Sequence, residues 1–188
     1  MASVRELGLD PVESDMTERR VTLPKLLLIG YARHGKDTAA QMFSDIYGFK
    51  FTSSSWFAAQ EFLWDVWGCA VYSTIEEMFE DRVNHRVLWM RMISAYNTPD
   101  KTWTARTMFE RGYNMYVGMR RLDELLACRE AGILDHVIWI DRSKHLPPEI
   151  GSMDIRAEHA DIILDNNGDL NDLRQNILNL GAEIVGRR

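Results

Sequence analysis

Residues 25–38, KLLLIGYARHGKDT, constrain the fold of this chain more than any other stretch. An apolar run, 25–29, predicts a short strand that is buried on both faces. Gly30 and Gly35 follow it with four residues between them, and Lys36 comes next, which is the spacing of a phosphate-binding loop. The stretch therefore predicts a parallel α/β sheet with a phosphate site where the first helix begins.

The residue after the lysine is unusual for such a loop. Asp37 stands where Ser or Thr is common, and Thr38 follows it. A carboxylate is a hard oxygen ligand, so we expect Asp37 to hold Mg²⁺ directly or through water, with Thr38 donating to a phosphate oxygen. The alternative is that Asp37 only stabilises the positive end of the helix dipole. His34, inside the loop, is expected to be exposed and not catalytic.

The rest of the chain alternates strands with helices, which predicts a three-layer α/β/α sandwich around a parallel sheet. Residues 1–23 are expected to form a flexible arm, and 24–188 a single domain with a helical insert at about 56–112 after the second strand. Strands are predicted at 25–29, 49–52, 114–118, 136–141 and 160–164, and helices at 36–46, 56–68, 74–97, 102–111, 122–130 and 169–180.

Composition restricts the partners of the chain. The formal net charge of −6 argues against sequence-blind binding to nucleic acid, which usually needs a basic face. No apolar run approaches the roughly 20 residues that span a bilayer, so no membrane partner is expected. Cys69 and Cys128 lack metal-ligand spacing, and we expect two buried, reduced thiols in the cytoplasm.

The GKDT sequence resembles the loop of the bacteriophage-type deoxynucleoside monophosphate kinases and, more distantly, that of dephospho-coenzyme A kinases. The segments MYVGMRRLDELLACREAG and ADIILDNNGDLNDLRQNI are similar to the family's third and last strands with their helices. The resemblance covers roughly residues 25–185, although only the loop is highly specific. It implies a P-loop kinase fold, ATP and Mg²⁺ as cofactors, and the cytoplasm as location (the host cytoplasm if phage-encoded).

The resemblance also implies roles for individual residues. Arg120, at the end of the third strand, would face substrate phosphates, and Arg142, with Arg156 as a second candidate, would close a lid-like segment, 142–159, over ATP. Lys36, Arg120 and Arg142 would therefore be catalytic. The donor nucleotide would be bound by Gly30, Arg33, His34, Gly35, Lys36, Asp37, Thr38 and, near the adenine, Asn166. The chain departs from the family at Gly118, where an Asp is frequent, and Asp37 or Asp141 would then have to hold the metal.

Two further groups could bind the acceptor. Arg82, His85 and Arg86 are spaced to lie on one helix face, where the arginines would grip a phosphate or simply face solvent. Ser54 and Ser55 follow the second strand and would bond the acceptor, unless a serine there only caps the next helix. The tryptophans of the insert are expected to be core residues rather than a base-stacking surface.

Three functions fit these features. The first is transfer of the γ-phosphoryl group of ATP to a deoxynucleoside monophosphate, and it is the function that we expect. The alternative is phosphorylation of a modified base in DNA, such as 5-hydroxymethyluracil, for which the unusual insert is the support. The third is a regulatory nucleotide-binding module, supported only by Gly118. Self-association into a homodimer is left open.

Overall fold

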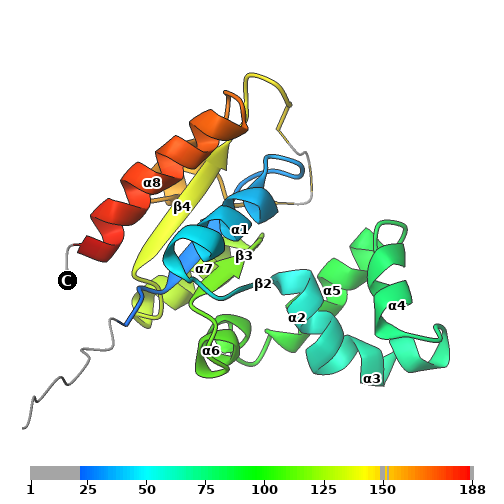
Figure 1. Ribbon diagram of the computed structural model, residues 1–188. Coiled ribbons are helices and arrows are strands. Elements are labelled where there is room, and N and C mark those ends of the chain that lie inside the picture. The colour runs from blue at the N-terminus through cyan, green and yellow to red at the C-terminus, as the bar shows by residue number, and fades with distance from the viewer. Residues whose placement is uncertain (1–21, 149–150, 152, 187–188) are drawn as a thin grey trace, which may run out of the picture.

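The computed structural model describes residues 22–148, 151 and 153–186, so most of the expected N-terminal arm and part of the lid-like segment lie outside the described residues. Its centre is a five-stranded sheet with every strand parallel, in the order β2-β3-β1-β4-β5 (Figure 1). The predicted parallel α/β sheet is confirmed. The strands are β1 (Leu26–Ile29), β2 (Phe51–Ser53), β3 (Met115–Val117), β4 (His136–Asp141) and β5 (Ile162–Asp165).

Strand β1 lies in the middle of the sheet, and all four of its side chains are fully buried. Successive side chains of a strand point to opposite faces, so Leu26 and Leu28 enter one half of the core while Leu27 and Ile29 enter the other. Helices cover both faces, which explains why the strand is apolar throughout. The first strand thus ends, at Gly30, in the middle of the molecule.

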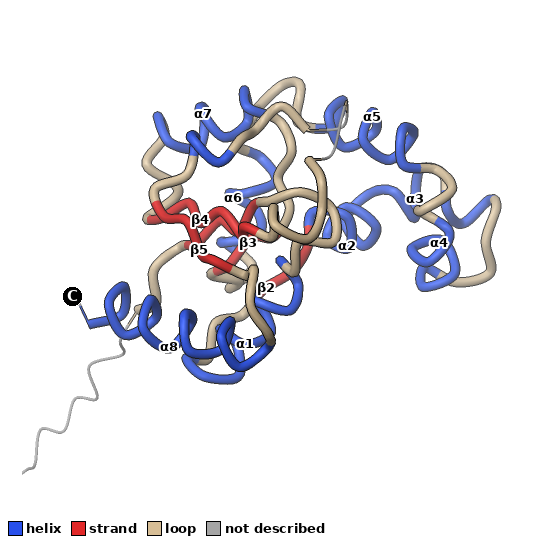
Figure 2. Tube along the Cα trace, turned by 90° about the horizontal axis from the view of Figure 1, so that it is seen from above, coloured by secondary structure: helices blue, strands red, loops and turns tan. Residues whose placement is uncertain are grey.

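Helices cover both faces of the sheet (Figure 2). Helices α1 (Lys36–Tyr47) and α8 (Leu170–Gly186) pack on one face, where the Tyr47 hydroxyl donates to the Leu178 carbonyl at 2.6 Å. Helices α6 (Trp103–Glu110) and α7 (Leu122–Glu130) pack on the other. Helix α6 belongs to the predicted insert by sequence, yet its apolar side packs against the sheet.

The remaining helices between β2 and β3 project beyond the edge of the sheet (Figure 1). They enclose a small core of their own, in which Trp89 is buried and against which Trp56, Trp64 and Trp67 pack while partly buried. The expected core role is confirmed for these tryptophans, although Trp89 also lines the cavity described below. The first of these helices continues through one stretch of π-helix before it ends near Trp67. In order they are α2 (Ser54–Ala58), the π-helical Ala59–Leu63, α3 (Trp64–Val66), a 3₁₀ turn (Gly68–Ala70), α4 (Ile75–Asp81) and α5 (Arg86–Tyr96).

The prediction of one helix over 74–97 is wrong, because the chain turns at 82–85 between α4 and α5. Asp81 explains the interruption. Its carboxylate accepts hydrogen bonds from the Tyr72 hydroxyl at 2.6 Å and the Asn84 amide at 2.6 Å, and lies 3.0 Å from His85 Nε2. Such local side-chain bonds compete with helix continuation.

Cys128 is buried in the core as expected, but the expectation that Cys69 is buried is wrong. Cys69 lies in the 3₁₀ turn at the outer end of the insert, and its thiol donates to the Asp65 carbonyl. Among the described residues, no helix is both long and apolar enough to cross a membrane.

Candidate functional site: a phosphate-binding loop facing an arginine-lined cavity

The loop after β1 has a backbone that requires glycine at two positions. Gly30 has φ 147°, and a Cβ there would approach the Ile140 carbonyl oxygen to 2.7 Å. Gly35 has φ 89°, and a Cβ there would collide with the side-chain amide of Asn166. Side chains rarely adopt such φ angles, so both glycines are needed for this loop to form between β1 and α1.

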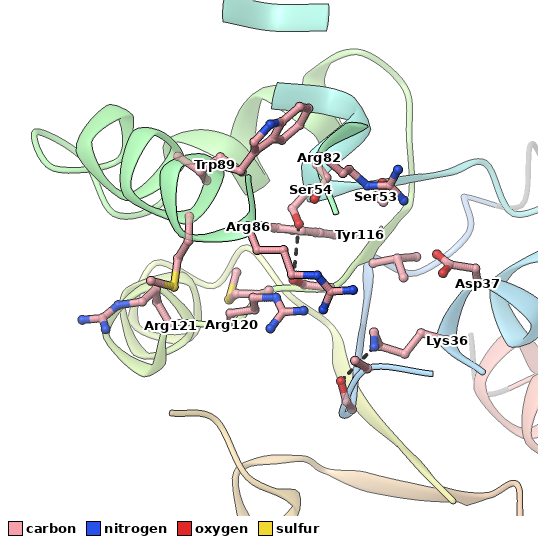
Figure 3. Close-up of a pocket in the computed structure, with 18 of the residues that line it drawn as sticks. Lys36, Asp37, Ser53, Ser54, Arg82, Arg86, Trp89, Tyr116, Arg120 and Arg121 are labelled. Atoms are coloured by element: carbon pink, nitrogen blue, oxygen red, sulfur yellow. Dashed lines mark hydrogen bonds between the residues drawn. The ribbon is translucent and has the colours of Figure 1, made fainter. Parts of the chain in front are cut away.

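Lys36 begins α1 and folds back over the loop (Figure 3). Its Nζ donates to the carbonyl oxygens of Gly30 at 2.9 Å and Tyr31 at 2.8 Å. Within the described residues, no side chain caps the start of α1. The backbone N–H groups of the first turn and the Lys36 ammonium therefore form a set of donors that fits the phosphates of a nucleotide.

His34 is 1% exposed, so the expectation of an exposed side chain is wrong. Its Nδ1 accepts a hydrogen bond from the Arg142 backbone N–H at 3.3 Å, and the edge of the Tyr31 ring packs against it. Burial lowers the pKa of His34, and the charge of Lys36 acts in the same direction. The imidazole of His34 thus packs behind the loop and is not among the side chains that line the cavity beside it.

Asn166 and Arg142 lie behind the same loop. The Asn166 amide donates to the His34 carbonyl at 2.9 Å, and the Arg142 guanidinium donates to the Asn166 carbonyl at 2.8 Å. Neither residue lines the cavity described next. Their observed contacts hold the loop, and the donor-binding and lid roles that the family resemblance implies stay predictions.

A cavity of about 520 Å³ opens beside the loop, at the carboxyl ends of β1, β2 and β3, and the insert forms its far wall. This is the edge where open parallel sheets bind ligands, and the volume suits a small molecule. Nine residues predicted as site residues line it together: Gly30, Arg33, Lys36, Asp37, Ser54, Ser55, Arg82, Arg86 and Arg120. Five others do not, namely His34, Gly35, Thr38, Arg142 and Asn166.

Three arginines face the phosphate-binding loop. Figure 3 shows the guanidinium groups of Arg82, Arg86 and Arg120 on the side of the cavity where Lys36 and Asp37 lie. Arg121 points the other way and forms ion pairs with Asp123 and Asp154. A cluster of guanidinium groups beside a phosphate loop can hold anionic oxygens of a second ligand.

Arg82 is held in place by its own turn. Its guanidinium carbon lies 3.6 Å from the centre of the Phe79 ring, and its Nη1 donates to the Phe79 carbonyl. Burial lowers the pKa of Arg82 and the neighbouring Arg86 does so too, whereas the Asp37 carboxylate raises it. The expectation that Arg82, His85 and Arg86 share one helix face is wrong: His85 turns outward to Asp81 and the Trp67 ring.

The serines after β2 have different structural roles. The Ser53 hydroxyl accepts from the Trp56 N–H at 3.1 Å and caps α2. Ser54 donates to the Gly118 carbonyl at 3.3 Å, across the floor of the cavity. Ser55 lines the cavity as well. The capping alternative is thus correct for Ser53, while Ser54 and Ser55 remain candidates for contact with the acceptor.

The candidate metal ligand is Asp37, an exposed carboxylate on the cavity side of the loop. Gly118 has φ 94°, so the Asp that is frequent there in the family that the sequence resembles would be strained in this backbone. Asp141 is engaged elsewhere, since its carboxylate accepts from Ser143 and from Asn167. One carboxylate together with substrate phosphates and water is a sufficient donor set for Mg²⁺, so the residues fit this cofactor.

Sequence reasoning missed the apolar wall and one acid of the cavity. Trp89, Met90 and Ile93 of α5 form the wall, and Glu124 of α7, only 4% exposed, lies among the lining residues. The Trp89 Nε1 is buried without a hydrogen-bond partner among the described residues. The sequence places Glu124 in the first turn of the helix after the third strand, but no spacing in the sequence signals that it is buried at a cavity.

This fold is similar to that of a shikimate kinase from Bacteroides thetaiotaomicron, with a TM-score of 0.51 and 12% sequence identity over 88% of this chain and 99% of that chain. A sugar kinase from Janibacter is matched with a TM-score of 0.44 and 14% identity, over 88% and 95% of the two chains. No protein-family model and no curated protein matches the sequence. The chain thus has the P-loop kinase fold, and this fold by itself identifies no substrate.

Proposed function

We propose that this protein is an ATP-dependent phosphotransferase that moves the γ-phosphoryl group to a deoxynucleoside monophosphate. The observation that carries the proposal is one cavity with two chemically different parts. Arg82, Arg86 and Arg120 face the phosphate-binding loop, and an apolar wall from α5 continues away from them. A nucleoside monophosphate has two matching parts, an anionic phosphate and a planar base whose aromatic faces are apolar.

The chain's own residues would act by position and charge. The loop amides and Lys36 would hold the donor phosphates, and the arginines would hold the acceptor phosphate in line with them. Asp37 would hold Mg²⁺, which when bound neutralises phosphate charge. An acceptor phosphate is already a nucleophile, so no buried base is required, and the insert and loop would exclude water from the reacting groups.

A second candidate is phosphorylation of a modified base in DNA, such as 5-hydroxymethyluracil. The observation that favours it is the apolar surface beside the cavity. Val83, which lines the cavity, is 53% exposed, and Val87 on the next turn is 59% exposed. Such side chains could pack against an extruded nucleotide and its neighbours. The formal net charge of −6 weighs against it.

Transfer of label from γ-labelled ATP distinguishes these functions. The acceptors would be each free deoxynucleoside monophosphate, duplex DNA with thymine or 5-hydroxymethyluracil, and shikimate, the substrate named for the similar fold. We expect label in a deoxynucleoside diphosphate. Label on DNA only when the hydroxymethyl group is present, or on shikimate, would overturn the proposal.

A loop variant shows that the observed transfer belongs to this site. Lys36→Ala removes the ammonium that faces the donor phosphates, and we expect kcat to fall by roughly 100-fold or more. Lys50→Ala, at an exposed lysine that does not line the cavity, is the matched control and should keep full activity. Equal activity of both variants would refute the kinase assignment.

A further inference from the structure

Glu124 is a buried acid at the cavity that phosphoryl transfer, as described above, does not use. It lies in the first turn of α7, is 4% exposed and lines the cavity. Burying a carboxyl group is costly unless hydrogen bonds compensate for the lost water. Its partners therefore indicate what the residue can offer to a ligand.

One oxygen of Glu124 is occupied by a neighbour with a fixed orientation. The Asn97 Nδ2 donates to Glu124 Oε1 at 3.0 Å, and the Thr104 hydroxyl donates to Asn97 Oδ1 at 2.7 Å. All three side chains are buried. A carboxylate only accepts, so Asn97 has to present its NH₂ group to Glu124. The remaining acceptor capacity of Glu124 is left for the cavity.

The protonation state of Glu124 is set by opposing effects. Burial raises the pKa of Glu124 and so does the Asp123 carboxylate, while the Asn97 hydrogen bond and the charges of Lys101 and Arg121 act in the opposite direction. An ionised Glu124 offers only acceptors to a ligand, whereas a protonated one would also offer a donor. Burial is the largest of these effects, so the pKa of Glu124 is raised overall, and the bond from Asn97 opposes this shift by favouring the ionised form.

Helix α5 shows at which end of the cavity Glu124 lies. Arg86 is the first residue of α5, and Asn97, the partner of Glu124, follows its last residue. With a rise of 1.5 Å per residue these two positions are about 16 Å apart along the helix. Trp89, Met90 and Ile93 line the cavity between them. A nucleotide with its phosphate at Arg86 would thus direct its base toward Glu124.

We infer that Glu124 selects the base of the acceptor by accepting a hydrogen bond from an exocyclic amino group. This inference rests on the proposed function. Cytosine, adenine and guanine carry such an amino group, whereas the exocyclic groups on the edges of thymine and uracil are carbonyl oxygens, which cannot donate to the carboxylate. Because an unpaired buried acceptor is costly, we expect a preference of roughly 10- to 100-fold in kcat/KM for the amino-bearing nucleotides.

Glu124→Gln tests the inference, because it keeps the shape of the side chain and replaces the hydrogen-bond acceptor that faces the cavity with a donor. The Gln oxygen has to stay toward the Asn97 NH₂ group, so its own NH₂ group faces the cavity. We expect the variant to prefer dTMP and dUMP over dCMP, dAMP and dGMP. Asp123→Asn is the matched control, since Asp123 neighbours Glu124 in sequence, pairs with Lys101 and does not line the cavity.

Two readouts separate this inference from the proposed function: kcat and KM for the five nucleotides, and their equilibrium binding by calorimetry without ATP. A wild-type preference for dTMP or dUMP, or an equal loss for all five nucleotides in Glu124→Gln, would overturn the inference while the kinase assignment stands. Binding selectivity that reverses in the variant without any turnover would support Glu124 and refute the kinase. If none of the five nucleotides binds, both the inference and the kinase assignment are refuted. If the variant does not fold, the preference of the wild-type protein still tests the inference.

Discussion

Asp37 lies where the two halves of the proposed site meet. It follows Lys36 in the first turn of α1, and its carboxylate is close enough to Arg82 of the insert to raise the pKa of that guanidinium. A negative charge at this position can serve the helix dipole, a metal ion or the arginine. These roles differ in what happens when the charge is removed.

We predict that Asp37→Asn raises the Mg²⁺ concentration needed for half-maximal phosphoryl transfer by about 10- to 100-fold, because a ligand of the cation is lost. A magnesium titration of the initial rate measures this. Asp45→Asn changes an exposed acid of the same helix, which bonds Gln41 at 2.8 Å, and should leave the titration unchanged. An unchanged titration for Asp37→Asn as well would show that the residue serves the helix or Arg82 instead.

Gly118 gives a prediction about stability rather than about catalysis. Its φ of 94° is unfavourable for any side chain, although a Cβ would meet only the Ser54 hydroxyl at an ordinary 3.6 Å. Gly118→Ala should therefore lower the free energy of unfolding by about 1–2 kcal/mol through backbone strain alone. Urea unfolding measures the change. Gly186→Ala, at the end of α8 where a Cβ meets nothing within 4 Å, should not destabilise, and an equal loss in both would refute the strain argument.

At the scale of elements, the insert is joined to the main domain through buried polar contacts. Asn97, at the end of α5, bonds Glu124 on α7 and Thr104 on α6. These three helices therefore share one hydrogen-bond network below the cavity. Such a network contributes less to the free energy of unfolding when one member changes its charge. Its contribution to stability should therefore depend on pH.

We predict that Glu124→Gln becomes more stable relative to the wild type as pH rises from about 4 to 8. The pKa of Glu124 is raised in the folded state, chiefly by burial, so its favourable contribution is complete below its ordinary pKa and is lost as pH rises through the folded pKa. Gln does not titrate and keeps its stability. Unfolding free energies of both proteins across this range measure the difference.

Asp123→Asn should show the opposite trend and is the internal control. Burial acts to raise the pKa of Asp123, but Lys101 and Arg121 outweigh it and place this pKa below the ordinary value. The contribution of Asp123 to stability is therefore present above its ordinary pKa and lost as pH falls through its folded pKa. Asp123→Asn should thus become less stable relative to the wild type as pH rises. If the stability of both variants relative to the wild type changed with pH in the same direction, the opposite pKa shifts of Glu124 and Asp123 would be contradicted.

The whole molecule consists of a well-buried sheet and an insert with a separate small core. All of β1 is fully buried, whereas Val66, Val71, Val83 and Val87 of the insert are more than half exposed. Segments with a small core of their own open more often than the central strands do. A ligand in the cavity would contact both parts and should oppose this opening.

Hydrogen exchange tests this picture of the whole protein. We predict that the amides of α4 and α5 exchange faster than those of β1 and β4, and that ATP with a deoxynucleoside monophosphate slows exchange in α5 most. Mass spectrometry of peptides from 75–81 and 86–96 against peptides from 26–29 and 136–141 measures the difference. Equal exchange in both parts, or ligand protection confined to the loop after β1, would contradict it.

Local sequence was sufficient for the parts of this protein whose conformation depends on neighbours in the chain. The apolar run before Gly30, the glycine spacing and Lys36 specify strand, loop and helix start, because backbone donors and forced φ angles are local properties. The order of strands and helices followed from periodicity in the same way. The turn at 82–85 was missed, since it depends on which groups Asp81 bonds.

Tertiary structure alone decided what the loop faces. The burial of His34 follows from its position between the loop and β4, and the cavity follows from the meeting of α5, α7 and three strand ends. Contacts between residues far apart in the chain, such as Asn97 with Glu124, leave no regular spacing in the sequence. The sequence by itself thus determined a phosphate-binding loop on a parallel sheet. Only the packing of the insert against that sheet decided the shape and charge of the cavity beside the loop, because burial and orientation are set by distant parts of the chain.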